Sequence, residues 1–122
     1  MRSKCVLTLV TIFLLGAVSA HAAVLRVVMV ETSDAAAYLK ALEQGKTLMK
    51  AKGLPANVRI WRARFAGVQA GSVAVGIEYA NLEALAKADA TMASDPELRA
   101  WLQGLDKVRK IVSDSVYEEM TP

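Results

Sequence analysis

The sequence predicts an α+β domain in which helices cover one face of a four-stranded antiparallel sheet, with the order β-α-β-β-α-β. Two observations predict this class. Runs of apolar and β-branched residues of strand length alternate with segments of helical periodicity. Short turn signals rich in glycine, asparagine and proline separate these segments. A chain of this length can bury one core without disulfides, so we expect a single domain over residues 23–122.

The first strand and the first helix occupy residues 24–52. Residues 24–31 (VLRVVMVE) are mostly apolar and β-branched, which is typical of a strand. Asp34 follows as a helix-start residue, and Gly53 and Pro55 mark the end of the helix predicted over residues 35–52. Gly45 lies within that helix and is expected to mark a close packing contact. The predicted apolar side of the helix contains Ala35, Leu39, Leu42 and Met49, flanked by Tyr38 and Leu48.

The middle of the chain predicts a hairpin of two strands. Residues 57–66 (NVRIWRARFA) and 72–80 (SVAVGIEYA) alternate, and the connection between Gly67 and Gly71 has glycine at both ends. In the second of these strands the bulkier set is expected to face the helices, and the smaller set to face away. The bulkier set is Val73, Val75, Ile77 and Tyr79, and the smaller set is Ala74, Gly76 and Glu78. For residues 57–66 the alternation leaves open which set faces inward.

The last part of the chain predicts two helical segments and a fourth strand. Asn81 can cap a helix over residues 82–93, and Ser94-Asp-Pro-Glu97 is a capping pattern that starts a short helix ending at Gly104. Residues 109–120 predict the fourth strand. Its helix-facing residues are expected to be Val112 and Val116, and its opposite face to contain Ile111, Ser113, Ser115 and Tyr117. The complete order is that of the ferredoxin-like fold.

The first 22 residues predict a cleavable signal peptide. Arg2 and Lys4 form a positive start, residues 6–18 are apolar, and small residues lead to a cleavage site after Ala22. The apolar run is short for a membrane span, although an uncleaved N-terminal anchor is the alternative. We therefore expect a periplasmic or secreted protein with no membrane association after cleavage.

Cleavage after Ala22 would change the chemistry available to the protein, because residues 1–22 contain the only Cys and the only His, Cys5 and His21. The remaining chain holds thirteen Lys and Arg against twelve Asp and Glu, so its charge gives no reason to expect nucleic-acid binding. Without His and Cys, neither a transition-metal site nor a Cys–His or Ser–His–Asp nucleophile is expected. We expect no metal and no cofactor.

The element order and three segments resemble the dimeric α+β barrel superfamily. These segments are VRIWRARFAGVQAGSVAVGIEY, SDPELRAWL and SDSVYEEM. The small NIPSNAP-like and antibiotic-biosynthesis-monooxygenase-like proteins are similar over residues 23–122. The resemblance implies a homodimer whose two sheets face each other around a small organic ligand. A cofactor-independent oxygenase or isomerase is one alternative. A non-catalytic structural or partner-binding dimer is the other, and the sequence leaves open whether the protein is an enzyme.

Two groups of residues are candidates for a ligand site. Arg62 and Arg64 can hold a carboxylate of a ligand while Glu78 acts as acid or base, or these side chains form a cross-strand ion pair. Trp61 can stack on a flat ligand, or it can anchor the core or a dimer interface.

Tyr117, Ser113 and Ser115 share one predicted strand face and offer three hydroxyl groups. They form either part of a site, with Tyr117 as a catalytic candidate beside Glu78, or the polar edge of a dimer interface.

Overall fold

A computed structural model describes residues 22–55 and 57–120 of the chain. The predicted signal peptide therefore lies outside the described residues, except for Ala22. Within the described part of the chain, no helix is both long and apolar enough to cross a membrane. The elements run in the order β1 (Val24–Glu31), α1 (Ala35–Ala51), β2 (Val58–Arg62), the 3₁₀ turn η2 (Gly67–Gln69), β3 (Val73–Tyr79), α2 (Leu82–Ser94), α3 (Pro96–Leu105) and β4 (Lys110–Glu118).

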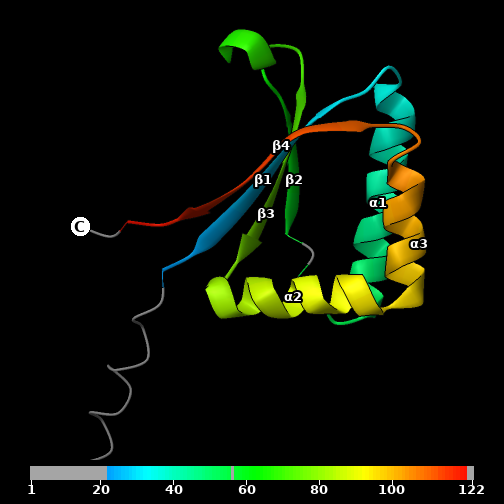
Figure 1. The fold of residues 1–122 in the computed structure, drawn as a ribbon, viewed down its shortest axis with the longest axis vertical. Coiled ribbons are helices and arrows are strands. Elements are labelled where there is room, and N and C mark those ends of the chain that lie inside the picture. The colour runs from blue at the N-terminus through cyan, green and yellow to red at the C-terminus, as the bar shows by residue number, and fades with distance from the viewer. Residues whose placement is uncertain (1–21, 56, 121–122) are drawn as a thin grey trace, which may run out of the picture.

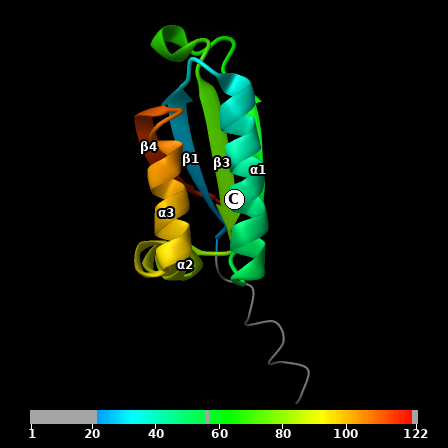
Figure 2. The same cartoon turned by 90° about the vertical axis from the view of Figure 1, so that its right-hand side faces the viewer.

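The predicted ferredoxin-like α+β fold is confirmed. The four strands form one antiparallel sheet in the order β2-β3-β1-β4, so the first and third strands lie at its centre. The helices cover one face of this sheet (Figures 1 and 2). Helices α1 and α3 lie side by side, and α2 crosses one end of the pair (Figure 2). No α-helix among the described residues covers the opposite face of the sheet (Figure 1).

The core lies between the sheet and the helices, and the strand register explains which residues enter it. Val24, Val28 and Val30 of β1 are Cα partners of Tyr79, Val75 and Val73 of β3, so all share one face of the sheet. The predicted inward face of β3 is therefore confirmed. The largest fully buried side chains are Tyr38, Leu98, Leu105, Val24 and Val30.

Strand β2 differs from the sequence prediction in length, and the register settles its orientation. Val58 and Ile60 are partners of the inward residues Ile77 and Val75, so this set faces the helices. The strand was predicted to reach residue 66 but ends at Arg62. Ala63 makes the last backbone hydrogen bonds of the hairpin, with Ser72 O at 2.8 Å and Gly71 N at 2.8 Å. The residues after it enter the turn.

A β-bulge corrects the predicted faces of β4. Met29 pairs with Ser113 but Val30 pairs with Ile111, so Val112 is an extra residue in the strand. An extra residue reverses the alternation on one side of the bulge. Ile111 consequently lies on the helix side of the sheet, whereas the sequence prediction placed it opposite. Ser113, Ser115 and Tyr117 are on the open face as predicted.

Helix α1 buries a line of residues that differs from the predicted one, because Tyr38, predicted at its flank, is fully buried and Leu39 is not. Its buried residues are Tyr38, Leu42, Gly45 and Met49. Leu39, predicted to belong to the core, is 44% exposed. The predicted start is confirmed, because the Asp34 side chain accepts a hydrogen bond from Ala37 N. Tyr38 and Leu39 are adjacent apolar residues, so periodicity alone did not decide which of the two faces the core.

Candidate functional site

A cavity of about 460 Å³ lies between the helix-facing side of the sheet and the three helices. We call it the helix–sheet cavity. Strands of the sheet form its floor and the helices form its walls. Its lining residues are Arg26, Val28, Leu42, Lys46, Met49, Leu54, Pro55, Val58, Val75, Ile77, Tyr79, Ala88, Asp89, Met92, Ala93, Arg99, Trp101, Leu102, Gln103, Leu105, Arg109, Ile111 and Asp114.

The apolar walls follow from the alternation of the strands and the faces of the helices. Val28, Val75 and Ile77 come from the inward set of the two central strands. Met92 and Leu102 reach the cavity from α2 and α3. Apolar surface of this kind, with few polar groups, is what a concave site for a small organic molecule requires.

Trp101 sets the spacing between α3 and α1. Its indole lies directly against Gly45, where an added Cβ would overlap the ring and come within 2.6 Å of Cη2. Its Nε1 donates a hydrogen bond to the Ala41 backbone oxygen at 2.9 Å. The absence of a side chain at Gly45 therefore lets the two helices pack with a large aromatic residue between them. The contact predicted from the mid-helix glycine is confirmed.

A charged group occupies one side of the helix–sheet cavity. Arg26 donates from Nε and Nη2 to Asp114, at 2.9 and 2.7 Å, and from Nη1 to Asp89 at 2.7 Å. The hydrogen bond from Arg26 lowers the pKa of the Asp114 carboxyl below its ordinary value. Burial raises the pKa of the neighbouring Tyr79 hydroxyl, so that phenol is held in its neutral form. The guanidinium of Arg26 is therefore hydrogen-bonded to two carboxylates, those of Asp89 and Asp114.

Arg109 lies at another part of the cavity and has much weaker partners. Its side chain is only 10% exposed, and its Nε has no hydrogen-bond partner among the described residues. The Asp106 carboxylate lies 3.6 Å from Nε, beyond hydrogen-bonding distance, and the Tyr38 hydroxyl lies 3.5 Å from Nη1. A nearly buried guanidinium is therefore left with donor capacity next to an apolar cavity.

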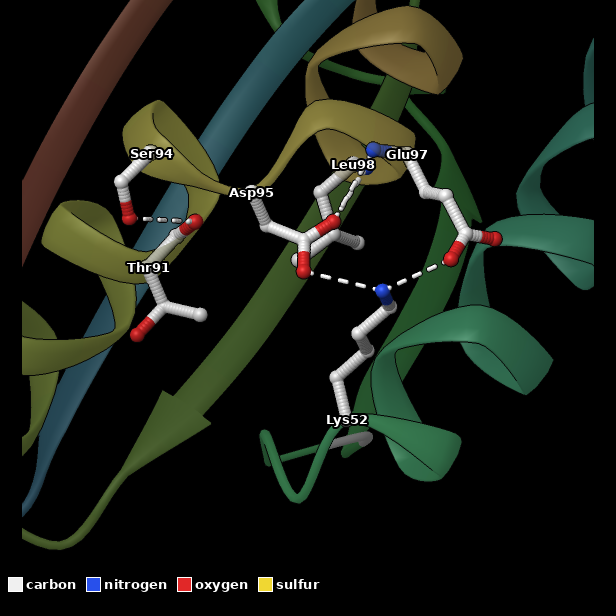
Figure 3. A network of polar contacts seen from close by, with 6 residues as sticks. All are labelled: Lys52, Thr91, Ser94, Asp95, Glu97 and Leu98. Atoms are coloured by element: carbon white, nitrogen blue, oxygen red, sulfur yellow. Dashed lines mark hydrogen bonds and ion pairs between the residues drawn. The ribbon is translucent and has the colours of Figure 1, made fainter.

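An ion-pair network fixes the end of α1 next to the start of α3 (Figure 3). Lys52 Nζ lies 2.9 Å from Asp95 Oδ2 and 2.9 Å from Glu97 Oε1. Asp95 also caps α3 by accepting hydrogen bonds from the backbone of Glu97 and Leu98, at 3.0 and 3.1 Å. The hydrogen bond from Lys52 lowers the pKa of Asp95. This network holds the wall helices at the end where α2 meets α3.

Most of the candidate residues predicted from the sequence lie on the open face of the sheet. Trp61 lies against Gly76, and the guanidinium of Arg59 is 5.6 Å from the centre of its ring. Glu78 pairs with Arg59, at 3.7 Å, rather than with the predicted Arg62 or Arg64. This is a cross-strand ion pair between two exposed side chains, the kind of contact that one of the two sequence interpretations expected, but with Arg59 as the cation.

The remaining candidates are not gathered into one site. Glu78 and Tyr117 are both partners of Leu25, on opposite sides of β1, so they lie two strand spacings apart, about 10 Å. Ser115 and Ser113 share this open face. Arg62 is the partner of Val73, so it belongs to the set of β2 residues on the helix side of the sheet. Arg64 lies beyond the end of β2. None of the residues predicted from the sequence as catalytic or ligand-binding lines the helix–sheet cavity.

Arg26 and Arg109 are two of the charged cavity residues that the sequence interpretation missed. Arg26 carried a usable signal, because it is the one charge in the inward set of β1, between Val24 and Val28. A charge on an inward strand face is unusual unless it is paired there. Arg109 carried no comparable signal, because it lies in the turn before β4 and its burial depends on packing against α1 and α3.

The fold defines the class of protein to which this chain is similar. No protein-family model matches the chain, and no curated protein is a significant sequence relative. A crystal structure of a NIPSNAP family protein from Agrobacterium tumefaciens strain C58 matches with a TM-score of 0.62 and 17% identity, over 84% of this chain and 87% of that one. The likeness confirms the fold that the resemblance to NIPSNAP-like proteins implied.

A second solved structure has the same architecture. It is a conserved protein of unknown function from Bacteroides thetaiotaomicron VPI-5482, described as a possible oxidoreductase. It matches with a TM-score of 0.59 and 9% identity, over 82% of this chain and all of that one. At these identities the likenesses establish the ferredoxin-like fold, and a shared activity does not follow from them.

Proposed function

We propose that this protein binds a small, mainly apolar organic molecule in the helix–sheet cavity. The observation that carries the proposal is the cavity itself, whose volume of about 460 Å³ lies within the range of small-molecule sites, about 300–1,000 Å³. Most of its lining residues are apolar, and six of them are charged.

This proposal moves the ligand from the face that the sequence indicated. The sequence interpretation placed it between two facing sheets, with Trp61 beside it. The cavity supports a position on the other side of the sheet, among the helices. We assign no reaction to the site, because Glu78 and Tyr117 lie on the open face, too far apart to act on one atom within a single chain.

Two adjacent valines provide a matched test. Val28 lines the helix–sheet cavity, whereas Val27 is on the opposite face of the same strand. A Trp61→Phe background leaves Trp101, which lines the cavity, as the fluorescent reporter. In this background 1-octanol should give a saturable change in Trp101 emission. Val28→Phe should abolish the change, because the larger side chain enters the cavity, while Val27→Phe should retain it.

Two results would count against the proposal. The absence of any saturable response in the Trp61→Phe protein would show that the cavity does not take an eight-carbon apolar chain. Loss of binding in Val27→Phe but not in Val28→Phe would place the ligand on the open face instead.

We further propose that a second copy of the chain covers the open face of the sheet. Leu25 and Val27 lie on this face, and Trp61 and Tyr117 there are 47% and 57% exposed. An exposed group of apolar and aromatic side chains on one sheet face supports an interface. Native mass spectrometry should give a dimer that Val27→Arg converts to monomer. A monomeric parent protein at micromolar concentration would refute this assembly.

We also propose that the protein is exported, because charged, apolar and small residues follow one another at the start of the chain as they do in a signal peptide. In a bacterial host the protein should be recovered from the periplasm with the intact mass of residues 23–122. Recovery of the full-length mass in the membrane fraction would instead support an uncleaved anchor.

A further inference from the structure

The environment of Arg109 carries an inference about the ligand. Nine-tenths of this side chain is buried, yet its Nε has no hydrogen-bond partner among the described residues. Burying a guanidinium costs free energy unless an anion compensates it at hydrogen-bonding distance. Asp106 does not provide this, because its carboxylate is 3.6 Å from Nε and is itself largely exposed.

The other carboxylate near Arg109 is already engaged. Asp114 feels the positive charge of Arg109, which contributes to lowering its pKa. However, each of its two oxygens accepts a hydrogen bond from Arg26, at 2.9 and 2.7 Å. Arg26 also holds Asp89, so both carboxylates that line the cavity belong to one arginine. Among the described residues, Arg109 has no carboxylate within hydrogen-bonding distance.

The charges lining the cavity favour an anion as well. Four of the lining residues are cationic and two are anionic. The cations are Arg26, Lys46, Arg99 and Arg109, and the anions are Asp89 and Asp114. Arg26 pairs with both of these carboxylates, whereas the carboxylates nearest to Lys46 and Arg109 lie outside the lining, at 3.5 Å (Glu43) and 3.6 Å (Asp106). Arg109 is the most buried of the four cations.

We infer that the ligand of the helix–sheet cavity is an apolar carboxylate, whose acid group binds Arg109 while its hydrocarbon part lies along the valine and methionine walls. This inference rests on the proposed function and deepens it by naming the chemical class. Arginine suits the role because its planar guanidinium can donate two parallel hydrogen bonds to a carboxylate.

Three probes with the same eight-carbon chain test the inference: octanoate, 1-octanol and octylammonium. Binding is followed through Trp101 emission in the Trp61→Phe protein. Octanoate should bind with a dissociation constant about tenfold or more below that of 1-octanol, which corresponds to about 1.4 kcal/mol or more. Octylammonium should bind most weakly, because it would place a second cation beside Arg109.

The variants separate Arg109 from the other cations. Arg109→Met should bring octanoate to the affinity of 1-octanol or below it, and Arg109→Lys should restore part of the preference. Arg99→Met is the matched control, since Arg99 also lines the cavity but is exposed, and it should keep most of the preference.

Each outcome decides between the two proposals. Equal binding of octanoate and 1-octanol to the Trp61→Phe protein would overturn the carboxylate inference and leave the proposed function standing, and this comparison needs no Arg109 variant to fold. A preference that disappears in Arg99→Met but persists in Arg109→Met would overturn the assignment to Arg109. If none of the three probes binds, both the inference and the proposed function are wrong.

Discussion

The contact between Gly45 and Trp101 gives a prediction whose sign depends on the structure. In an isolated helix, replacing a glycine with alanine is favourable by about 1 kcal/mol. Here the new Cβ would overlap the indole ring of Trp101, including an approach of 2.6 Å to Cη2. The ring is rigid and its Nε1 is bonded to Ala41 O, so it cannot yield without losing that bond.

The change in the free energy of unfolding caused by Gly45→Ala combines two unfavourable contributions and one favourable contribution. Forcing an extra methyl group into a packed site costs about 1–3 kcal/mol. Displacing the indole leaves its part-buried N–H without a partner, which costs about 1–3 kcal/mol more. The gain in helix propensity offsets about 1 kcal/mol of this. We therefore expect Gly45→Ala to lower the free energy of unfolding by about 1–5 kcal/mol.

Urea unfolding of four variants tests this reasoning. Gly104→Ala is the matched control, because Gly104 also lies in a helix but an added Cβ there meets nothing within 4 Å. It should be neutral or stabilising by up to about 1 kcal/mol. The double variant Gly45→Ala with Trp101→Leu should be more stable than Trp101→Leu alone, since the overlap is gone. A stabilising Gly45→Ala, or a loss that persists in the Trp101→Leu background, would refute the packing described here.

Two further predictions concern the ion pairs. Because Arg26 lowers the pKa of Asp114 in the folded protein, the stability that Asp114 contributes is present above the ordinary aspartate pKa, about 3.9, and is lost as the pH falls below it. The Asp114→Asn variant should therefore unfold at a lower urea concentration than the parent at pH 7, and it should lose less stability than the parent on acidification. Urea midpoints that fall in parallel with pH for the two proteins would contradict this. Asp95→Ala should destabilise more than Glu97→Ala, because Asp95 both caps α3 and binds Lys52 whereas Glu97 only pairs. Equal urea midpoints for the two variants would count against that order.

The sequence predicted the fold because local signals agreed with the topology. The alternation in β3 assigned both of its faces correctly, and the capping pattern at Asp95 placed the break between the last two helices. Gly45 was recognised as a packing position for a simple reason. A glycine inside a helix is unfavourable unless the space that it leaves is used.

The features that the sequence did not predict depend on long-range packing. The extra residue at Val112 has no local signature, so the reversal of Ile111 follows only from the pairing of β4 with β1. The length of β2 was set by where the hairpin closes, at Ala63. Arg109 lies beside the Tyr38 hydroxyl of α1, which is 71 residues away in the sequence, so no local pattern indicated its place in the helix–sheet cavity.

The central claim is that a ligand occupies the cavity among the helices rather than the open face of the sheet. Methyl NMR spectra of the protein titrated with octanoate test it most directly. Saturable shifts are predicted for Leu42, Ile77 and Met92, which line the cavity, with no comparable shifts for Leu25 and Val27 on the opposite face. Saturable shifts centred on Leu25 and Val27, or no saturable shifts at all, would contradict the account.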